Sequence, residues 1–110
     1  MIVEVRTYKL KPGSREKFLT IFETRSIPAH HEIGMKIVGP LLDIETADAF
    51  VFLRGFPSLE DRDRMKTAFY EGELWKGELE AILMPMIENY VVTLCEVPPG
   101  FVFDDIRAGV

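Results

Sequence analysis

The chain contains few of the residues that carry metals, disulfides or membrane anchors. Its 110 residues include one cysteine, two histidines and one tryptophan. Cys95 has no cysteine to pair with inside the chain and stands among apolar residues, which is typical of a small buried strand residue. No apolar run approaches the roughly 20 residues that a membrane-spanning helix needs. The N-terminus lacks a basic start before an apolar stretch, so we expect no signal peptide and a cytoplasmic location.

An excess of basic charge is also missing. The chain has 13 Lys and Arg against 18 Asp and Glu, for a net charge of -5. Nucleic-acid binding and basic membrane docking both depend on clustered Lys and Arg, so we expect neither partner. There is no phosphate loop, nucleophile elbow, paired-cysteine motif or dinucleotide fingerprint. We therefore expect no cofactor.

What remains is the composition of an ordinary globular domain, with 47% hydrophobic and 28% charged residues. Four segments are rich in β-branched and aromatic residues and are bounded by turn signals, which is typical of strands. They are 2–10, 35–44, 49–56 and 87–97.

Helix signals lie between these segments. Ser14 can cap a first helix, and Ser58 begins an S-L-E-D capping-box pattern for a second. Apolar residues at helical spacing continue the second region from Trp75 to Pro85. The order predicts an α+β, ferredoxin-like βαββαβ domain, with an antiparallel four-stranded sheet and its helices on one face.

Two prolines are expected to disturb these elements. Pro28 disfavours helix at the residue before it, so the first helix should end or kink there, and Gly34 suits a left-handed cap for a further turn. Pro40 cannot donate to a sheet ladder, so the second strand should be bulged or lie at an edge.

The strands are apolar on both faces. Residues 50–53 are consecutive apolar residues, as are 91–92, whereas a sheet with one wet face shows regular alternation. The helices of a βαββαβ unit cover only one face. We therefore expect a second copy to cover the other, giving a homodimer or a higher oligomer.

Residues 4–13, EVRTYKLKPG, resemble the E-L-R-T-Y-x-L-K-P-G opening of NIPSNAP-family domains. The sequences IVG at 37–39 and FPSLEDR at 56–62 also agree with that family, as does Trp75 followed by Pro85. The resemblance covers a domain of residues 1–97 and implies a dimeric α/β-barrel of ferredoxin-like subunits. Residues 98–110 form an extension that we expect to dock on the domain or on a partner subunit.

The resemblance implies little about chemistry. Family members usually carry an Asp-Pro pair before the tryptophan, and this chain has EGEL at 71–74 instead, which alters the mouth of any cavity beneath that helix. Haem-degrading relatives of the barrel use an Asn, a Trp and a His together. The chain offers no convincing equivalent, so haem chemistry is disfavoured.

The first strand carries the leading candidate site. Arg6 and Tyr8 lie two residues apart and share a face with Glu4. If that face points at the helices, the arginine could bind a carboxylate or enolate and the tyrosine could transfer a proton. The alternative is a structural interaction between Glu4 and Arg6, with Tyr8 filling volume in the core.

Four further residues have two interpretations each. Trp75 forms either core or the wall of a ligand cavity, and Arg54 either snorkels at a strand end or anchors an anionic group.

His30 and His31 diverge on a helix and do not face one metal together, so no metal site is predicted. One of them could serve as a general base; otherwise both are solvated. Residues 61–64 are interpreted as a solvated helix face with local ion pairs.

Two functional hypotheses follow. In the first, a small organic molecule binds in a cavity between sheet and helices. The finer form of this hypothesis is a cofactor-independent enzyme of oxygenase or isomerase type, by analogy with related barrels. In the second, the chain is a non-catalytic interaction module that acts through its dimer surface. The second predicts a filled interior and a large exposed apolar patch.

Overall fold

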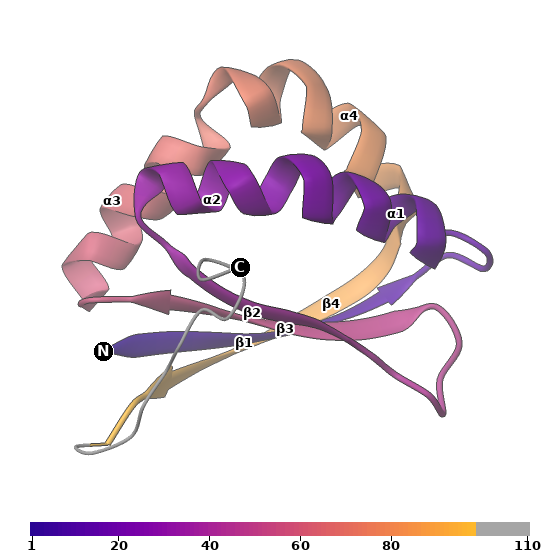
Figure 1. Ribbon diagram of the computed structural model, residues 1–110, viewed down its shortest axis with the longest axis horizontal. Helices are drawn as coiled ribbons and strands as arrows, with labels where there is room; N and C mark the ends of the chain where they lie inside the picture. The colour runs from indigo at the N-terminus through magenta and orange to yellow at the C-terminus, as the bar shows by residue number, and fades with distance from the viewer. Residues whose placement is uncertain (99–110) are drawn as a thin grey trace.

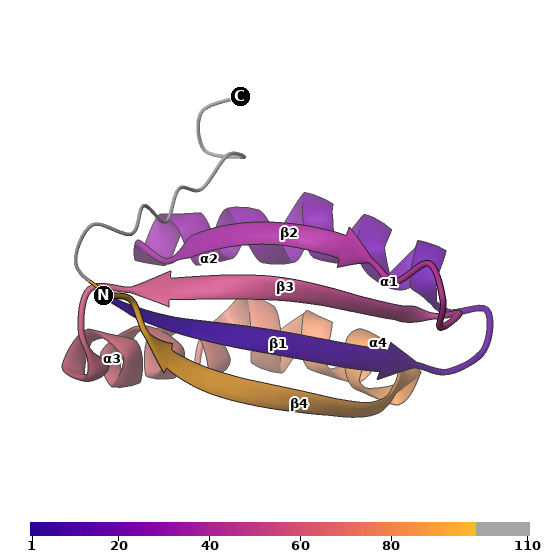
Figure 2. The ribbon, with the colours of Figure 1, turned by 90° about the horizontal axis from the view of Figure 1, so that it is seen from below.

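Four antiparallel strands form one sheet in the computed structural model, which describes residues 1–98. The spatial order is β2-β3-β1-β4, so the first and third strands are central (Figure 2). The strands are β1 (Ile2–Leu10), β2 (Lys36–Leu42), β3 (Ala49–Phe56) and β4 (Ile87–Glu96). Their bounds agree with the predicted segments to within two residues.

Two helical regions pack on one side of this sheet (Figure 1). The first consists of α1 (Arg15–Ile21), a π-helical segment (Phe22–Ser26) and α2 (Ile27–Ile33). The second consists of α3 (Leu59–Tyr70), a π-helical segment (Trp75–Leu79), α4 (Glu80–Leu83) and a 3₁₀ turn (Met84–Met86). The predicted α+β, ferredoxin-like βαββαβ fold is confirmed.

The first helical region continues past Pro28, so of the two predicted alternatives, an end or a kink, the end is wrong. The Ile27 N–H bonds to the carbonyl of Phe22, five residues back, which is π-helical pairing. Pro28 then falls in the first turn after this change of pairing, where a missing N–H is tolerated. The helix ends as predicted at Gly34, which has a left-handed φ of 102°.

Gly39 and Pro40 disturb the second strand in both predicted ways. β2 lies at the edge of the sheet, and its register against β3 shifts between Val38 and Leu41. The Gly39–Pro40 peptide is cis. Because β2 is an edge strand with a local irregularity at this point, the missing N–H of Pro40 interrupts no hydrogen bond of the sheet ladder.

The two faces of the sheet have different surroundings. Even-numbered residues of β1 and β3 face the helices, and Leu10, Phe50 and Phe56 among them are 0% exposed. On the opposite face Thr7 and Val91 are exposed, and no helix within residues 1–98 covers them (Figure 1). This face is the one that the predicted second copy would cover.

No helix within residues 1–98 is both long enough and apolar enough to cross a membrane. The predicted docking of the extension concerns residues 98–110, which lie outside the described part of the chain apart from Pro98. Cys95 is half-buried in β4 and has a free thiol.

Candidate functional site

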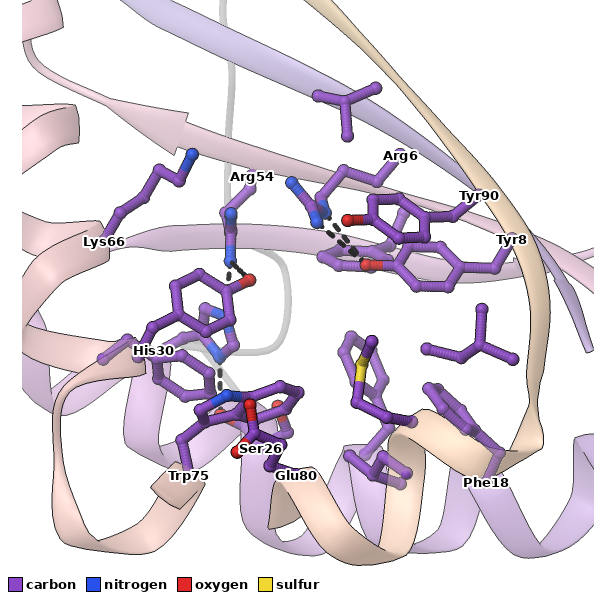
Figure 3. Close-up of a pocket in the computed structure, with 18 of the residues that line it drawn as sticks. Arg6, Tyr8, Phe18, Ser26, His30, Arg54, Lys66, Trp75, Glu80 and Tyr90 are labelled. Atoms are coloured by element: carbon purple, nitrogen blue, oxygen red, sulfur yellow. Dashed lines mark hydrogen bonds between the residues drawn. The ribbon is translucent and has the colours of Figure 1, made fainter.

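A cavity of about 600 Å³ lies between the sheet and the helices (Figure 3). Side chains from both layers line it, and its size falls within the range that small-molecule sites occupy in proteins. Arg6, Tyr8, Arg54 and Trp75, four of the residues singled out in the sequence, all line it together with His30.

The first strand places Arg6 and Tyr8 on the helix-facing side, because side chains alternate along a strand and Leu10 on the same side belongs to the core. Arg6 and Tyr8 are 6% and 8% exposed, and Glu4 on the same face is 0% exposed. This face therefore points at the helices, and Arg6 and Tyr8 line the cavity, whereas Glu4 is buried and is not part of the lining. The alternative interaction is present too, since Arg6 Nη1 donates to Glu4 Oε1 at 3.0 Å.

Glu4 is the acceptor for three arginines from three elements. Besides Arg6, Arg54 of β3 donates from Nε to Oε1 at 2.8 Å, and Arg62 of α3 donates from Nε to Oε2 at 2.7 Å. Burial alone would raise the pKa of Glu4, but the charges and hydrogen bonds of Arg54, Arg6 and Arg62 lower it to about 2. Glu4 is therefore a carboxylate at neutral pH.

Arg6 also holds the hydroxyl of Tyr8, to which it donates from Nε at 3.1 Å and from Nη2 at 2.9 Å. Burial raises the pKa of Tyr8, and the nearby Arg6 charge only partly opposes this. The hydroxyl is therefore protonated at neutral pH. Because its oxygen already accepts from Arg6, its proton remains to be donated.

Arg54 is 1% exposed, so the interpretation of Arg54 as a snorkelling residue is wrong. The side chain lies between sheet and helices instead of reaching water, because Glu4 and the Tyr70 hydroxyl hold it there, the latter at 2.9 Å from Nη1. Its Nη2 is buried and has no hydrogen-bond partner in the part of the chain that the structure describes.

His30 is buried at 2% exposure and uses both ring nitrogens. Nε2 lies 3.1 Å from Arg54 Nη1, and since a guanidinium only donates, Nε2 accepts. The proton is then on Nδ1, which donates to the carbonyl of Ser26 at 2.7 Å. Burial and the Arg54 charge lower the pKa of His30 to about 3. His30 is thus neutral and orients Arg54, an arrangement that does not favour a general base.

His31 does not line the cavity. The two neighbouring histidines diverge as their helical spacing predicts. Within residues 1–98 there is no group of three or more His, Cys, Asp or Glu side chains placed to hold a metal ion.

Arg62, Lys66 and Tyr70 line the cavity from α3, and the sequence analysis missed all three. The interpretation of residues 61–64 as a solvated face holds for the exposed Arg64–Asp61 pair at 2.8 Å but is wrong for Arg62. Arg62, Lys66 and Tyr70 are spaced four residues apart, and residues at this spacing share one face of a helix. This spacing is the sequence signal that could have identified them as a group.

Trp75 is half-buried and satisfies both of its interpretations. It packs edge-on against Tyr70 with ring centroids 5.2 Å apart and lies 5.8 Å from the ring of Phe69, while also lining the cavity. Figure 3 shows it on the helix side, opposite Arg6 and Arg54, which extend from the sheet.

Comparison with known proteins adds a family and a set of similar folds. The NIPSNAP family model matches residues 3–94. An uncharacterised NIPSNAP domain protein from Burkholderia xenovorans has a TM-score of 0.79 at 22% identity, with 94% of this chain and 100% of that chain covered. Protein Atu4242 from Agrobacterium tumefaciens has a TM-score of 0.79 at 25% identity, covering 91% and 96%.

The fold extends to more distant proteins. A crystal structure of an antibiotic biosynthesis monooxygenase has a TM-score of 0.67 at 15% identity, with 90% of this chain and 100% of that chain covered. At such identity the likeness concerns the fold alone. No curated protein matches the chain.

Proposed function

We propose that this chain, which belongs to the NIPSNAP family, binds a small organic molecule in the cavity between its sheet and its helices. The observation that supports this most directly is the convergence of buried polar groups on a cavity whose walls include several aromatic rings. Arg6, Tyr8 and Arg54 line the same space as Phe22, Phe52 and Trp75. A few oriented polar groups within apolar walls are the usual composition of a ligand site.

The cost of this arrangement to the fold also supports a ligand. Buried charges are expensive and are seldom used where apolar packing would serve. Here Glu4 and Arg54 are almost completely buried in a domain of only 110 residues. A domain built only to be stable would gain from apolar residues at these positions.

A screen of small carboxylates and aromatic compounds by thermal shift tests the proposal. We expect at least one compound to raise the melting temperature of the wild type but not of Val92→Trp, in which a larger side chain occupies the cavity wall. Ile44→Trp is the matched control, because Ile44 is 97% exposed and far from the cavity lining. If every stabilising compound acts equally on Val92→Trp, the cavity is not the site.

The finer form of the proposal is enolate chemistry of the isomerase or oxygenase type, without a cofactor. Tyr8 and Arg6 support it, because a protonated hydroxyl beside a guanidinium stabilises a developing enolate oxygen. The proton that leaves the carbon would pass to the carboxylate of Glu80, which lines the same cavity. The test is solvent deuterium exchange at the carbon next to the carbonyl of a compound found in the screen. Exchange that is lost in Tyr8→Phe is expected; exchange that persists there rejects the role of this hydroxyl.

The second candidate function is interaction through a dimer surface. The outer face of the sheet supports it: Val5, Val51 and Leu53 are only half-buried, and Val91 is 62% exposed. We propose a second copy as the occupant, because the centre of this face is apolar and uncharged and so complements itself across a two-fold axis.

Thr7→Lys tests this second proposal, because Thr7 is exposed at the centre of that face and its replacement removes no core packing. Sedimentation should show a dimer for the wild type and a monomer for Thr7→Lys. Leu59→Lys, at a residue 54% exposed on the helix side, should remain dimeric. A monomeric wild type contradicts the proposal.

A further inference from the structure

The polar end of the cavity has a surplus of positive charge. Arg6, Arg54 and Arg62 converge on the single carboxylate of Glu4, so three positive charges meet one negative charge and two positive charges are left over. The side chains of Arg6 and Arg54 are only 8% and 1% exposed, which leaves water little access to screen them.

The other charged residues that line the cavity do not remove this surplus. Lys76 pairs with Glu71 at 3.2 Å, and the single charges of Lys66 and Glu80, which also line the cavity, cancel in the sum. Both members of the Lys76–Glu71 pair are more than half exposed, so they are screened by solvent as well. The surplus therefore belongs to the buried arginines.

Most of the unused hydrogen-bonding capacity of the arginines and tyrosines at this end is donor capacity. Arg54 Nη2 has no acceptor within residues 1–98. The hydroxyls of Tyr8 and Tyr70 each accept from an arginine, which leaves each with a proton and, within residues 1–98, no acceptor for it. The one acceptor lone pair of the neutral His30 ring, on Nε2, already accepts a hydrogen bond from Arg54. A ligand that complements these groups brings mainly acceptors, as an anionic oxygen group does.

The opposite end of the cavity is apolar. Phe18 lies on the far side from Arg54 and Lys66 in Figure 3. Phe22 and Leu83 belong to the same lining and are buried. The cavity thus changes from donor groups to apolar walls along its length.

We infer that the ligand is an amphiphilic monocarboxylate, whose carboxylate is held by the Arg6–Tyr8–Arg54–Tyr70 end and whose aromatic or other flat apolar body extends towards Phe18, Phe22 and Leu83. This rests on the proposed function, since it names the class of molecule that the same cavity takes. The Arg62 side chain is 17% exposed, so solvent screens part of its charge, and a monocarboxylate fits the remaining surplus better than a phosphate dianion does. A planar carboxylate also matches the fork of a guanidinium.

Isothermal titration with two matched probes tests the inference. 2-Naphthoate and 2-naphthamide share their ring system and differ in the charge of one group. We expect the naphthoate to bind at least about tenfold more tightly, because a hydrogen bond to a charged group contributes more than one to a neutral group. In Tyr8→Phe this preference should shrink several-fold. In Tyr90→Phe it should be unchanged, since the hydroxyl of Tyr90 makes no bond to either arginine while its ring lies beside Tyr8.

Each outcome of these titrations either supports or overturns the inferred carboxylate ligand. Equal binding of the two probes overturns the anion inference and leaves the proposed small-molecule function standing. A preference for naphthoate that survives intact in Tyr8→Phe places the carboxylate elsewhere and also overturns it. If neither probe binds while the thermal-shift screen finds only uncharged ligands, the inference fails and the proposed function does not. The melting temperature of each variant verifies that it is folded.

Discussion

Arg54 lies opposite Glu4 in the antiparallel pairing of β3 with β1, and its Nε donates to Glu4 Oε1 at 2.8 Å. The strand register therefore creates this ion pair between residues 50 positions apart. It also aims both side chains at the helices, where Arg62 completes the cluster. The charge of Glu4 is consequently a requirement of the fold as well as of the site.

Glu4→Gln should be strongly destabilising. The substitution keeps the shape of the side chain but leaves three guanidinium groups without a counter-charge. Removing one partner of a buried ion pair costs about 3–5 kcal/mol, and we expect a loss of this order in the free energy of unfolding from urea denaturation. Glu78→Gln breaks the exposed Arg25–Glu78 pair at 2.7 Å and should have a far smaller effect. Equal losses for the two variants would contradict the role of Glu4.

Stability should depend on pH through His30. Its pKa is lowered from 6.5 to about 3 in the folded chain, so between these values the unfolded chain binds one more proton. The free energy of unfolding must then rise with pH, by about 1.4 kcal/mol per unit in this window. The contribution is fully present above pH 6.5 and is lost as the pH falls towards 3.

Denaturation of His30→Gln at pH 5 and pH 6 measures this contribution, because glutamine does not titrate. The variant should lose most of the slope that the wild type shows between these two values, whereas His31→Gln should keep it. Glu4 adds a separate loss only at lower pH, since its pKa moves from 4.5 to about 2. A wild-type stability that is flat from pH 6 to pH 5 would rule out a neutral buried His30.

The N-terminus of α3 gives a third prediction. The Ser58 hydroxyl accepts from the Asp61 N–H at 3.1 Å and donates to the Asp61 carboxylate at 3.0 Å. Ser58→Ala should therefore destabilise the protein by about 1 kcal/mol, and Ser58→Gly by only a few tenths. Thermal unfolding of both variants tests the cap. The prediction fails if alanine is tolerated as well as glycine.

Two glycines should respond to alanine in opposite directions. Gly39 has a φ of +118°, and a Cβ there would lie 3.0 Å from Phe52 Cβ, so Gly39→Ala should cost about 1–3 kcal/mol. Gly77 is helical with nothing within 4 Å of an added Cβ, so Gly77→Ala should stabilise by about 0.5–1 kcal/mol. Chemical denaturation of the pair measures the difference, and a stabilised Gly39→Ala would reject the backbone argument.

The strands and the cap could be predicted because they depend on local chemistry. The β-branched residues and turn signals located β1 and β3, and the S-L-E-D pattern located the start of α3. Alternation along β1 also placed Arg6 and Tyr8 on one face. These inferences need no knowledge of what packs against the segment.

The remainder depends on long-range packing. Arg62 and Arg64 look alike in the sequence, yet one reaches the buried Glu4 and the other remains in solvent. The difference arises from the side of α3 that rests on the sheet. Arg54 could be assigned to the interior only once α2 and α3 were known to lie over β3. The continuation of the helix past Pro28 depended on a local change to π-helical pairing that the prolines alone do not reveal.

Glu4 also couples parts of the chain that would otherwise open independently. Its carboxylate joins β1 to β3 through Arg54 and to α3 through Arg62. Lifting the first turns of α3 from the sheet would separate Arg62 from its buried counter-charge, which makes a local opening there nearly as costly as a wider one. Amide hydrogens in this part of α3 should therefore exchange with solvent together with those of the central strands, as one cooperative unit.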